Sequence, residues 1–412
     1  MNRFNVKIEP SRLVGKVIAP PSKSISHRAL ICAALAEGES VISNLAFSQD
    51  ILATIDVLTA IGAKINKIDN STLKVTGVAG KPRSLDVLGC RESGSTLRFM
   101  IPICLLSTDE FKLSGSEKLL SRPLSVYENL FAERYLGSDG KALTLASGKP
   151  IEPGKYRVAG NISSQFITGL LLALPLCDGD SKLIVEGDFE SASYVDLTVD
   201  TLSKFGINIT REGNIYSIKG NQKYIPSKAR IEGDASNAAF FGALGLIGED
   251  VELLGLNPES LQGDMVFNKH FSALKAHSDL PIDLSDCPDL APILFSAAAF
   301  FGGGIFTHPD RLRLKESDRI SAMAEELGKF GAVLDITDGL DGGTVKVLRS
   351  NLHPPSSPLD SHNDHRIAMS MAILCCRFGG EIIGAEAVRK SMPDFFDVLA
   401  SLGAKIQTET TK

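Results

Sequence analysis

A run of small and apolar residues, rich in alanine, occurs six times along this chain, and each run opens on a cluster of polar or charged residues. The runs start roughly 55–75 residues apart, which is the spacing of a repeat built from whole supersecondary units. Five of the six break at Gly or Asp and lead into a short stretch with β character, such as 182–185. The six polar clusters cover residues 23–28, 92–98, 163–165, 234–237, 288–290 and 363–366.

A second series of segments, which are amphipathic, alternates with these runs. Its members start near residues 50, 124, 196, 264, 318 and 393. Four of them end in the same way, with a Gly followed by alternating apolar residues, at 61–65, 205–209, 330–334 and 402–406. Gly is expected to end a helix there because it accepts the left-handed conformation. The sequence therefore predicts six repeats of strand, helix, strand, helix and a pair of strands. An ordinary doubly wound α/β protein with similar helices is the alternative.

Length and charge restrict the class of protein. A chain of 412 residues is too long for one hydrophobic core, so two domains are expected. The net charge of −6, with no basic run longer than two residues, argues against a nucleic-acid surface. No stretch approaches the ~20 apolar residues of a membrane span, and the first residues lack the apolar region of a signal peptide. We therefore expect a cytoplasmic protein that binds small anionic substrates, and neither nucleic acid nor membrane.

Cysteine and histidine spacing gives no sign of a metal site. No pair of cysteines has Cys-x-x-Cys spacing, so we expect small buried hydrophobic residues in a reducing compartment. His362 and His365, with Asp364 between them, could form a ligand pair, but Arg366 would repel a cation. The seven cysteines stand at positions 32, 90, 104, 177, 287, 375 and 376.

Cationic residues stand near several of the predicted helix starts. Because a helix N-terminus carries unpaired N–H groups and about half a positive charge, polar clusters at six such ends indicate one site for a heavily anionic ligand. The polar neighbours of Lys23 favour a ligand contact there, and Arg122 is placed where its donors could meet a carboxylate or phosphate. Arg98 could equally extend along the surface. A solvated, self-paired helix start is the alternative for the run 315–319.

Six short motifs stand in order along the chain. They are PSKSISHRA (21–29), SGSTLR (93–98), SSQF (163–166), LKESDR (314–319), NDHRIAM (363–369) and KSMPDFF (390–396). Each motif is weak by itself. Six in this order, from Lys23 to Phe396, are specific, and they resemble the EPSP synthase family of enolpyruvyl transferases over essentially the whole chain.

The resemblance implies a two-domain inside-out α/β barrel built from six βαβαββ repeats. One domain would cover about residues 20–229, the other 1–19 and 230–412, with the active site in the cleft between them. The family transfers the enolpyruvyl group of phosphoenolpyruvate to the 5-hydroxyl of 3-phosphoshikimate, in aromatic amino-acid biosynthesis, and releases phosphate. It uses no metal or organic cofactor, and glyphosate mimics phosphoenolpyruvate in it. We expect a monomer that acts on these two small-molecule substrates.

The same resemblance predicts three catalytic residues. Asp289 would hold the attacking hydroxyl as a base, Glu316 would serve C3 of the enol, and Lys23 would contact both substrates and the departing phosphate. Two carboxyl groups can share such acid–base work when their protonation states differ. A plain helix cap is the alternative role for Asp289, since Asp is a favoured capping residue.

The resemblance also predicts the substrate contacts. Tyr194 could stack near the site or be a core aromatic residue. Glu92 and Arg311 stand where some members of the family carry Asn, so the contacts at these two positions stay open. For 3-phosphoshikimate the predicted contacts are Lys23, Ser24, Arg28, Ser163, Ser164, Gln165, Ser191, Asp289 and Lys315. For phosphoenolpyruvate they are Lys23, Gly94, Arg122, Gln165, Arg319, Arg366 and Lys390.

Two other functions stay open. UDP-N-acetylglucosamine enolpyruvyl transferase shares the fold and the donor, but it pairs its early lysine with Asn and carries a reactive Cys in a Gly-rich loop. Here Ser24 follows Lys23 and no such loop is seen. A non-catalytic binding protein of the same fold is the second alternative, and the presence of Lys23, Asp289 and Glu316 argues against it.

Overall fold

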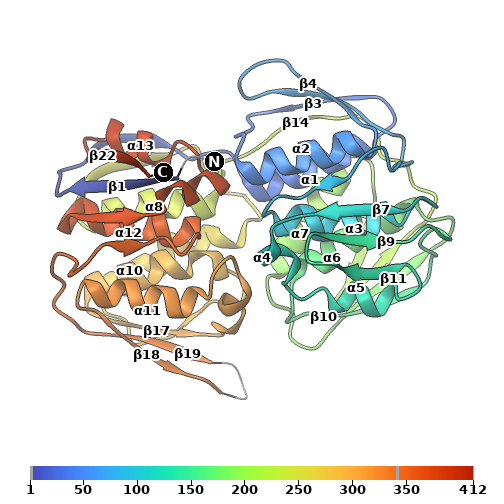
Figure 1. The fold of residues 1–412 in the computed structure, drawn as a ribbon. Coiled ribbons are helices and arrows are strands. Elements are labelled where there is room, and N and C mark those ends of the chain that lie inside the picture. Colours follow the sequence, from blue (N-terminus) through green and yellow to red (C-terminus); the bar gives the residue numbers. More distant parts are fainter. Residues whose placement is uncertain (1–2, 340–342, 412) are drawn as a thin grey trace. The chain divides into compact units, whose positions relative to one another are not determined.

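The computed structural model describes residues 3–339 and 343–411, and the chain divides into two compact units. One unit is Pro21–Glu232, and the other combines Met1–Pro20 with Gly233–Lys412. The chain therefore passes from one unit to the other twice. Within each unit the strands lie around the outside of the helices (Figure 1).

The unit Pro21–Glu232 contains three four-stranded sheets, with strand orders β14-β3-β5-β4, β6-β7-β9-β8 and β10-β11-β13-β12. The first two strands of each sheet are parallel, and the others pair antiparallel. Its helices are α1 (Lys23–Leu35), α2 (Gln49–Ala60), α3 (Gly94–Cys104), α4 (Glu117–Leu120), α5 (Ser125–Leu130), α6 (Ser164–Ala173), η1 (Leu174–Leu176) and α7 (Ala192–Lys204). Its strands are β3 (Glu39–Ser43), β4 (Lys64–Lys67), β5 (Leu73–Thr76), β6 (Leu88–Gly89), β7 (Phe111–Ser114), β8 (Tyr135–Ser138), β9 (Ala142–Leu145), β10 (Lys155–Ala159), β11 (Ser181–Glu186), β12 (Ile209–Glu212), β13 (Ile215–Ile218) and β14 (Lys228–Arg230).

The other unit contains two sheets of the same kind, β20-β21-β1-β22 and β16-β17-β19-β18, and a parallel pair, β15-β2. Its helices are α8 (Ala235–Leu246), η2 (Gly263–Val266), α9 (Phe267–Lys275), η3 (Pro288–Leu290), α10 (Ala291–Phe301), η4 (Asp310–Leu314), α11 (Arg319–Lys329), α12 (His365–Phe378), η5 (Ala385–Lys390) and α13 (Phe395–Ser401). Its strands are β1 (Arg3–Glu9), β2 (Val14–Ile18), β15 (Asp250–Leu254), β16 (Ile282–Asp283), β17 (Gly304–Thr307), β18 (Val333–Thr337), β19 (Thr344–Leu348), β20 (Leu359–Asp360), β21 (Gly380–Ile383) and β22 (Lys405–Thr411).

The predicted α/β repeat is confirmed, with one departure. Helices of the alanine-rich series (α1, α3, α6, α8, α10 and α12) alternate with those of the amphipathic series, as the sequence indicates. The fourth repeat lacks its closing pair of strands, because residues 276–281 form no strand between α9 and β16. In the sequence, this repeat is one of two without the Gly-led ending. The segment that starts near residue 124 also lacks it, yet β8 and β9 follow that segment.

The alanine-rich helices are buried on all sides. Every residue from Ser26 to Leu35 of α1 and from His365 to Cys376 of α12 is buried. A helix that is apolar all round must lie inside the protein, and small side chains let such helices approach closely. Each unit therefore has its own hydrophobic core, formed by these helices and the inner faces of the sheets.

Local contacts mark the helix ends, and the predicted glycine stops are confirmed. Five of these six helices begin at a Ser or Asp whose side chain accepts a backbone N–H of the first turn. The glycines predicted to end four amphipathic helices all have left-handed φ angles: Gly62 (108°), Gly206 (80°), Gly331 (89°) and Gly403 (107°).

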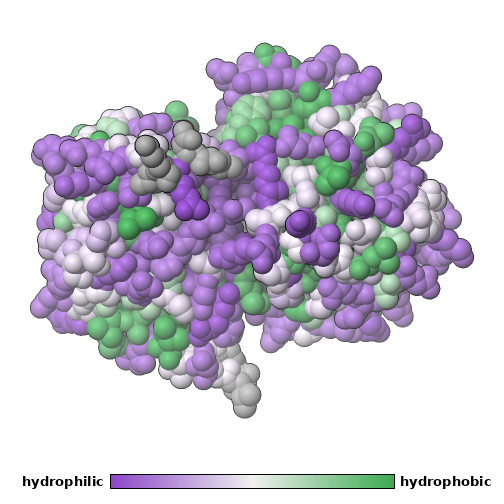
Figure 2. All heavy atoms as spheres, in the orientation of Figure 1, coloured by the Kyte–Doolittle hydropathy of each residue, from purple (hydrophilic) through white to green (hydrophobic). Residues whose placement is uncertain are grey.

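The surface and the cysteines agree with the composition. All seven cysteines are free and buried, as predicted. The face drawn in Figure 2 is mostly hydrophilic, with small separate hydrophobic patches. Among the described residues, no helix combines the length and the apolar character needed to cross a membrane.

Candidate active site

Asp289 is the centre of an ion-pair network just before α10. Its Oδ1 lies 2.9 Å from NH1 of Arg319 and 3.3 Å from Nζ of Lys315. Its Oδ2 lies 3.0 Å from NH2 of Arg366, whose NH1 also donates to the backbone oxygen of Asp289. No side chain caps the start of α10, so the alternative role of Asp289 as a helix cap is wrong. One carboxylate is thus held by three cations, which the starts of α11 and α12 supply.

Arg319 links three carboxylates and is only 1% exposed. Its NH2 donates to Oε2 of Glu316 at 2.6 Å, and its Nε donates to Oδ2 of Asp364 at 2.8 Å. Burial alone would lower the pKa of Arg319, but the charges of Asp364, Glu316 and Asp289 outweigh it and raise that pKa. Burial likewise opposes the charge of Asp364, yet Arg319 holds its pKa below the usual value. A solvated helix start is therefore excluded for this arginine.

The other predicted residues of this unit flank the network. Burial lowers the pKa of Lys315, and the opposing charge of Asp289 does not fully restore it. Nζ of Lys390 donates to the backbone oxygen of Asn363 at 2.6 Å, beside the start of α12. Arg311, in η4, is 9% exposed. Lys315 is thus a partly buried cation with a lowered pKa, next to the carboxylate predicted to act as base.

Gly94, Arg98, Arg122 and Gln165 come together in the other unit, where α3 packs against α6. Gln165 accepts a hydrogen bond from NH1 of Arg98 at 2.8 Å and donates to Oγ of Ser95 at 3.0 Å. A Cβ added to Gly94 would lie 3.1 Å from NH1 of Arg98 and of Arg122. The Arg122 side chain makes no hydrogen bond or ion pair within the part of the chain that the structure describes, and its Nε is buried. Because a buried charge without a counter-ion is costly, this cluster suits an anion.

Lys23 and Arg28 lie in the first two turns of α1. Nζ of Lys23 lies 3.0 Å from Oδ2 of Asp50, at the start of α2, and both side chains are mostly buried. Arg28 donates from NH1 to the backbone oxygen of Ser24 at 2.7 Å. Burial lowers the pKa of Arg28 to about 10, so it stays charged at neutral pH. Among the described residues, no carboxylate forms an ion pair with it.

The predicted serines mark the starts of α6 and α7. Ser163 caps α6, and the following Ser164 is 6% exposed. Ser191 stands at the N-cap position of α7 with a left-handed φ of 55°, and it is 2% exposed. Tyr194 lies in the next turn, and its backbone oxygen accepts a hydrogen bond from NH2 of Arg28 at 2.9 Å. The starts of α1 and α7 therefore meet around Arg28.

The structure thus collects the predicted residues into two groups, one in each unit. It adds Asp364 and Asp50, which sequence reasoning missed, and it brings Arg98, which had stayed open, next to Gln165. Asp364 lies inside one of the quoted motifs, and its capping pattern could have marked it. Arg98 also stood in a motif, but its choice between surface and site depends on the packing of α3 on α6. Asp50 gave no signal, because nothing in the sequence pairs it with Lys23.

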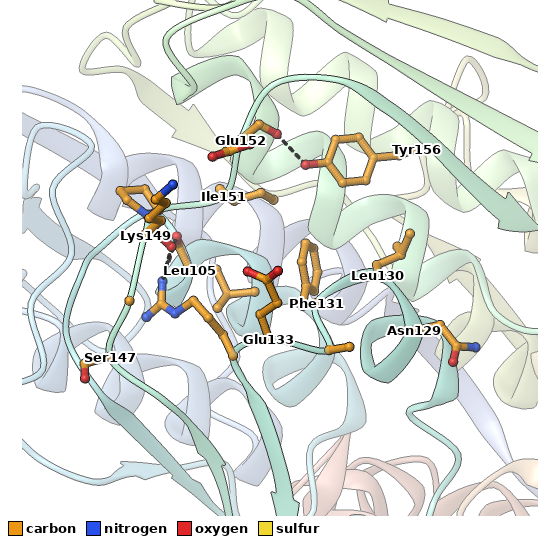
Figure 3. Close-up of a pocket in the computed structure, with 14 residues that line it drawn as sticks. Leu105, Asn129, Leu130, Phe131, Glu133, Ser147, Lys149, Ile151, Glu152 and Tyr156 are labelled. Atoms are coloured by element: carbon orange, nitrogen blue, oxygen red, sulfur yellow. Dashed lines mark hydrogen bonds between the residues drawn. The ribbon is translucent and has the colours of Figure 1, made fainter.

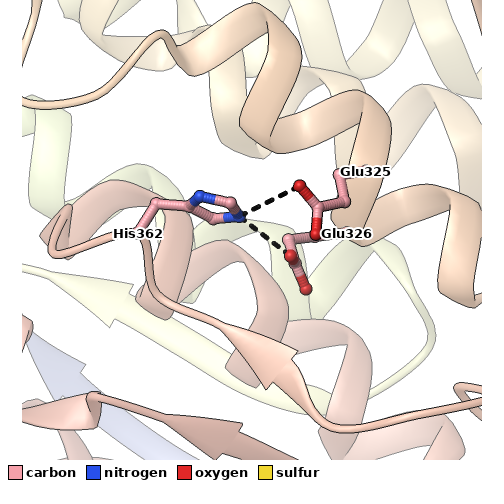
Figure 4. A group of neighbouring side chains, drawn as sticks. All are labelled: Glu325, Glu326 and His362. Atoms are coloured by element: carbon pink, nitrogen blue, oxygen red, sulfur yellow. Dashed lines mark hydrogen bonds and ion pairs between the residues drawn. The ribbon is translucent and has the colours of Figure 1, made fainter.

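One cluster outside these groups has ligand types that metals favour. Glu325, Glu326 and His362 point toward one another at the end of α11 (Figure 4). Both carboxylate oxygens of the fully buried Glu326 already accept hydrogen bonds from Nζ of Lys329 at 2.9 Å. Nε2 of His362 lies 2.9 Å from Oε1 of Glu326. An ion-pair network with Lys329 accounts for this cluster. His365, which the sequence had paired with His362 as a possible second ligand, is not part of the cluster.

A cavity of 720 Å³ opens beside α5 and β8 (Figure 3). Phe131 and Tyr156 line it, with ring centroids 6.4 Å apart. Arg134 also lines it, but every hydrogen bond that its guanidinium makes within the described residues goes to a backbone carbonyl. This arginine holds loops together, and none of the described lining residues belongs to the predicted site.

Comparisons with known proteins agree with the motifs. The family model described as EPSP synthase (3-phosphoshikimate 1-carboxyvinyltransferase) matches residues 8–399. A protein of Clostridium novyi named 3-phosphoshikimate 1-carboxyvinyltransferase is 43% identical over 98% of both chains. One of the same name from Clostridium acetobutylicum is 42% identical over 97% of this chain and 98% of its own.

Solved structures share the fold. An EPSP synthase from Acinetobacter baumannii has a TM-score of 0.78 at 24% identity, covering 99% of this chain and 100% of its own. The enolpyruvyl transferase NikO from Streptomyces tendae has a TM-score of 0.77 at 15% identity, covering 100% of both chains. At these identities the two structures support the architecture, and the family is shown by the sequence matches. The chain belongs to the EPSP synthase family.

Proposed function

We propose that this protein transfers the enolpyruvyl group of phosphoenolpyruvate to the 5-hydroxyl of 3-phosphoshikimate, giving 5-enolpyruvylshikimate 3-phosphate and phosphate. The observation that carries the proposal is the network around Asp289, in which Lys315, Arg319 and Arg366 hold one carboxylate and Arg319 binds Glu316. Two carboxyl groups and a set of cations are what an acid–base reaction between two anions requires. The family match over nearly the whole chain supports the same reaction.

The chemistry assigns a task to each carboxyl group. The 5-hydroxyl attacks C2 of the enol and gives its proton to Asp289, while C3 gains a proton from Glu316. A tetrahedral adduct forms, and it then eliminates phosphate as C3 returns a proton to Glu316. Lys23 neutralises charge on the departing phosphate. We propose that the reaction uses no metal or organic cofactor, as the family resemblance implies. Its steps are the attack of the 5-hydroxyl on C2, proton transfers and the departure of phosphate.

We assign the substrate contacts by charge. The 3-phosphoshikimate contacts are Lys23, Ser24, Arg28, Ser163, Ser164, Gln165, Ser191, Asp289 and Lys315. The phosphoenolpyruvate contacts are Lys23, Gly94, Arg122, Gln165, Arg319, Arg366 and Lys390. These assignments draw on both units, so we propose that the substrates bind residues of both. The unpaired Arg122 and the Arg28 that lacks a carboxylate partner support the assignment, since each gains a counter-ion on binding.

We also propose that the protein works as a cytoplasmic monomer. Seven free, buried cysteines fit a reducing compartment, and the net charge of −6 is unsuited to nucleic acid. Size-exclusion chromatography with light scattering would test the monomer.

The experiment that tests the function measures phosphate release from phosphoenolpyruvate with each acceptor in turn. We expect release with 3-phosphoshikimate and none with UDP-N-acetylglucosamine, and mass spectrometry should find the enolpyruvyl ether of the first. Release with the sugar nucleotide alone would reassign the acceptor. Binding of phosphoenolpyruvate without release in either arm would favour a binding protein. Lys23→Ala is the matched control, because it should remove turnover while the thermal transition stays cooperative.

A further inference from the structure

Arg28 is a buried cation held by neutral groups. It is 3% exposed, and its four hydrogen bonds within the described residues go to hydroxyl and carbonyl oxygens. A guanidinium has five N–H donors, so one donor, on NH1, is left within the described residues. Burying such a charge is costly unless its donors are satisfied. The geometry of these neutral partners therefore decides where the remaining donor points.

Two threonine hydroxyls form one side of this cradle. Nε of Arg28 donates to Oγ1 of Thr198 on α7 at 2.8 Å, and NH2 contacts Oγ1 of Thr168 on α6 at 3.4 Å. The two hydroxyl oxygens lie 2.9 Å apart. Both threonines are fully buried, so water does not compete for them. The pair joins α6 and α7, which pack together in the same unit, to a residue of α1 (Figure 1).

The hydrogen positions in this cradle follow from the donors. A hydroxyl has one hydrogen and two lone pairs. Thr198 donates to the backbone oxygen of Tyr194 at 3.0 Å, so it accepts from Arg28 and from Thr168. The hydrogen and both lone pairs of Thr198 are then used. Such a saturated network has one arrangement, and it fixes the plane of the guanidinium.

We propose that Thr168 and Thr198 are positioning residues for the acceptor substrate. They orient Arg28 so that its remaining donor faces an anionic group of 3-phosphoshikimate, and they do not touch the reacting atoms. The inference rests on the proposed function, because it takes Arg28 as a substrate contact. A loss of this orientation should weaken binding of the acceptor without slowing the chemistry once the acceptor is bound.

The test compares Thr198→Val and Thr168→Val with Thr201→Val as the matched control. Thr201 lies on the same helix, is 3% exposed, and donates to the backbone oxygen of Leu197, away from Arg28. Hydrogen bonds to charged groups are strong, so we expect the KM for 3-phosphoshikimate to rise about tenfold in the first two variants. The KM for phosphoenolpyruvate and kcat should change less than twofold. Thr198→Ser, which keeps the hydroxyl, should restore the wild-type KM, and Thr201→Val should match the wild type.

A double-substitution cycle separates positioning from general stability. Arg28→Ala alone should raise the KM for 3-phosphoshikimate, and adding Thr198→Val to it should change that KM less than twofold. An equal rise in Thr201→Val, or a full effect of Thr198→Val in the Arg28→Ala background, would overturn the inference. If Thr198→Val does not fold, Thr168→Val makes the same comparison from α6. An Arg28→Ala enzyme with the wild-type KM would instead overturn the proposed role of Arg28, and an inactive wild type the proposed function.

Discussion

Arg319 forms ion pairs with Asp289, Glu316 and Asp364. A substitution at any one of these carboxylates therefore removes one of its three ion-pair partners. Two carboxylates still hold it when one is replaced by an amide. The network should therefore keep its shape in single amide variants. The acid–base roles of Asp289 and Glu316 can therefore be tested by single amide substitutions that leave the rest of the network in place.

Asp289→Asn and Glu316→Gln should each lower kcat by about 10²–10⁴-fold, the usual contribution of a positioned acid or base. Each variant removes a proton-transfer group, while the neighbouring cations that bind anions stay in place. Steady-state rates give kcat, and calorimetric titration gives the affinity for 3-phosphoshikimate, which should stay measurable. If either variant kept more than about a tenth of the wild-type kcat, its acid–base role would have to be dropped.

Gly94→Ala should weaken the binding of phosphoenolpyruvate. The added methyl would lie 3.1 Å from the NH1 atoms of Arg98 and Arg122, which are the flexible ends of long side chains and can shift. Overpacking costs about 1–3 kcal/mol, so we expect KM for phosphoenolpyruvate to rise about tenfold and inhibition by glyphosate to weaken with it. Gly89→Ala is the control, since a Cβ there meets nothing within 4 Å. An unchanged KM in Gly94→Ala would separate this glycine from the donor site.

His362 should make folding stability depend on pH. Its hydrogen bond to Glu326 raises its pKa, although burial opposes the charge. A raised folded-state pKa adds stability that is fully present below the unfolded value of 6.5 and is lost as pH rises through the folded-state pKa. We compare Tm for the wild type and His362→Asn between about pH 5.5 and pH 9. Asn suits the left-handed φ of 49° at this position. The wild type should exceed the variant most at the acid end, and a constant gap would contradict the assignment.

At the scale of helices, the close approach of α3 and α6 sets the geometry of the donor cluster. Gly169 on α6 faces the backbone of α3, and a Cβ there would lie 2.7 Å from the backbone oxygen of Arg98. Tyr127 closes the same contact, because its single O–H lies within hydrogen-bond distance of the backbone oxygens of both Arg98 (2.9 Å) and Phe166 (3.1 Å). Gln165 and Arg98 can meet only if the two helices stay this close.

Gly169→Ala should therefore push α6 away from α3. We expect a loss of about 1–3 kcal/mol in unfolding free energy, together with a higher KM for phosphoenolpyruvate as Gln165 moves. Gly328→Ala on the exposed side of α11 is the matched control, because its Cβ meets nothing within 4 Å. That change should stabilise the protein by about 0.5–1 kcal/mol through helix propensity. Equal stability of the two variants in urea unfolding would rule out the tight contact.

These helices also show which features of the fold and the site could be predicted from the sequence. Caps such as Ser22 and stops such as Gly62 act through the nearest backbone, so their roles could be predicted. The motif residues could be assigned through the family they resemble. The pairing of Lys23 with Asp50 could not be predicted, because it depends on how two helices pack across 27 residues. The missing strands of the fourth repeat could not be predicted either, because the second repeat also lacks a Gly-led ending and still has its pair of strands, β8 and β9.

At the scale of the whole molecule, each unit has its own core, and the chain passes between the units at two places only. Two short connections allow relative motion unless something else ties the units together. Both groups of proposed site residues carry several cations. Without ligand, cations of the two groups repel one another at separations shorter than about 8–10 Å, because salt screens charges only beyond that distance.

Substrates that contact both groups should therefore compact the molecule. Under the proposal that each anion neutralises cations of both units, binding should shift the population toward more compact forms. We expect small-angle scattering to give a smaller radius of gyration with 3-phosphoshikimate plus glyphosate than with neither, at matched ionic strength. The Arg28→Ala variant is the control, since weaker binding of 3-phosphoshikimate should move the compaction to higher ligand concentration. A radius that stays constant at ligand concentrations shown by calorimetry to be saturating would mean that binding does not join the units, and the proposal that both units supply substrate contacts would then fail.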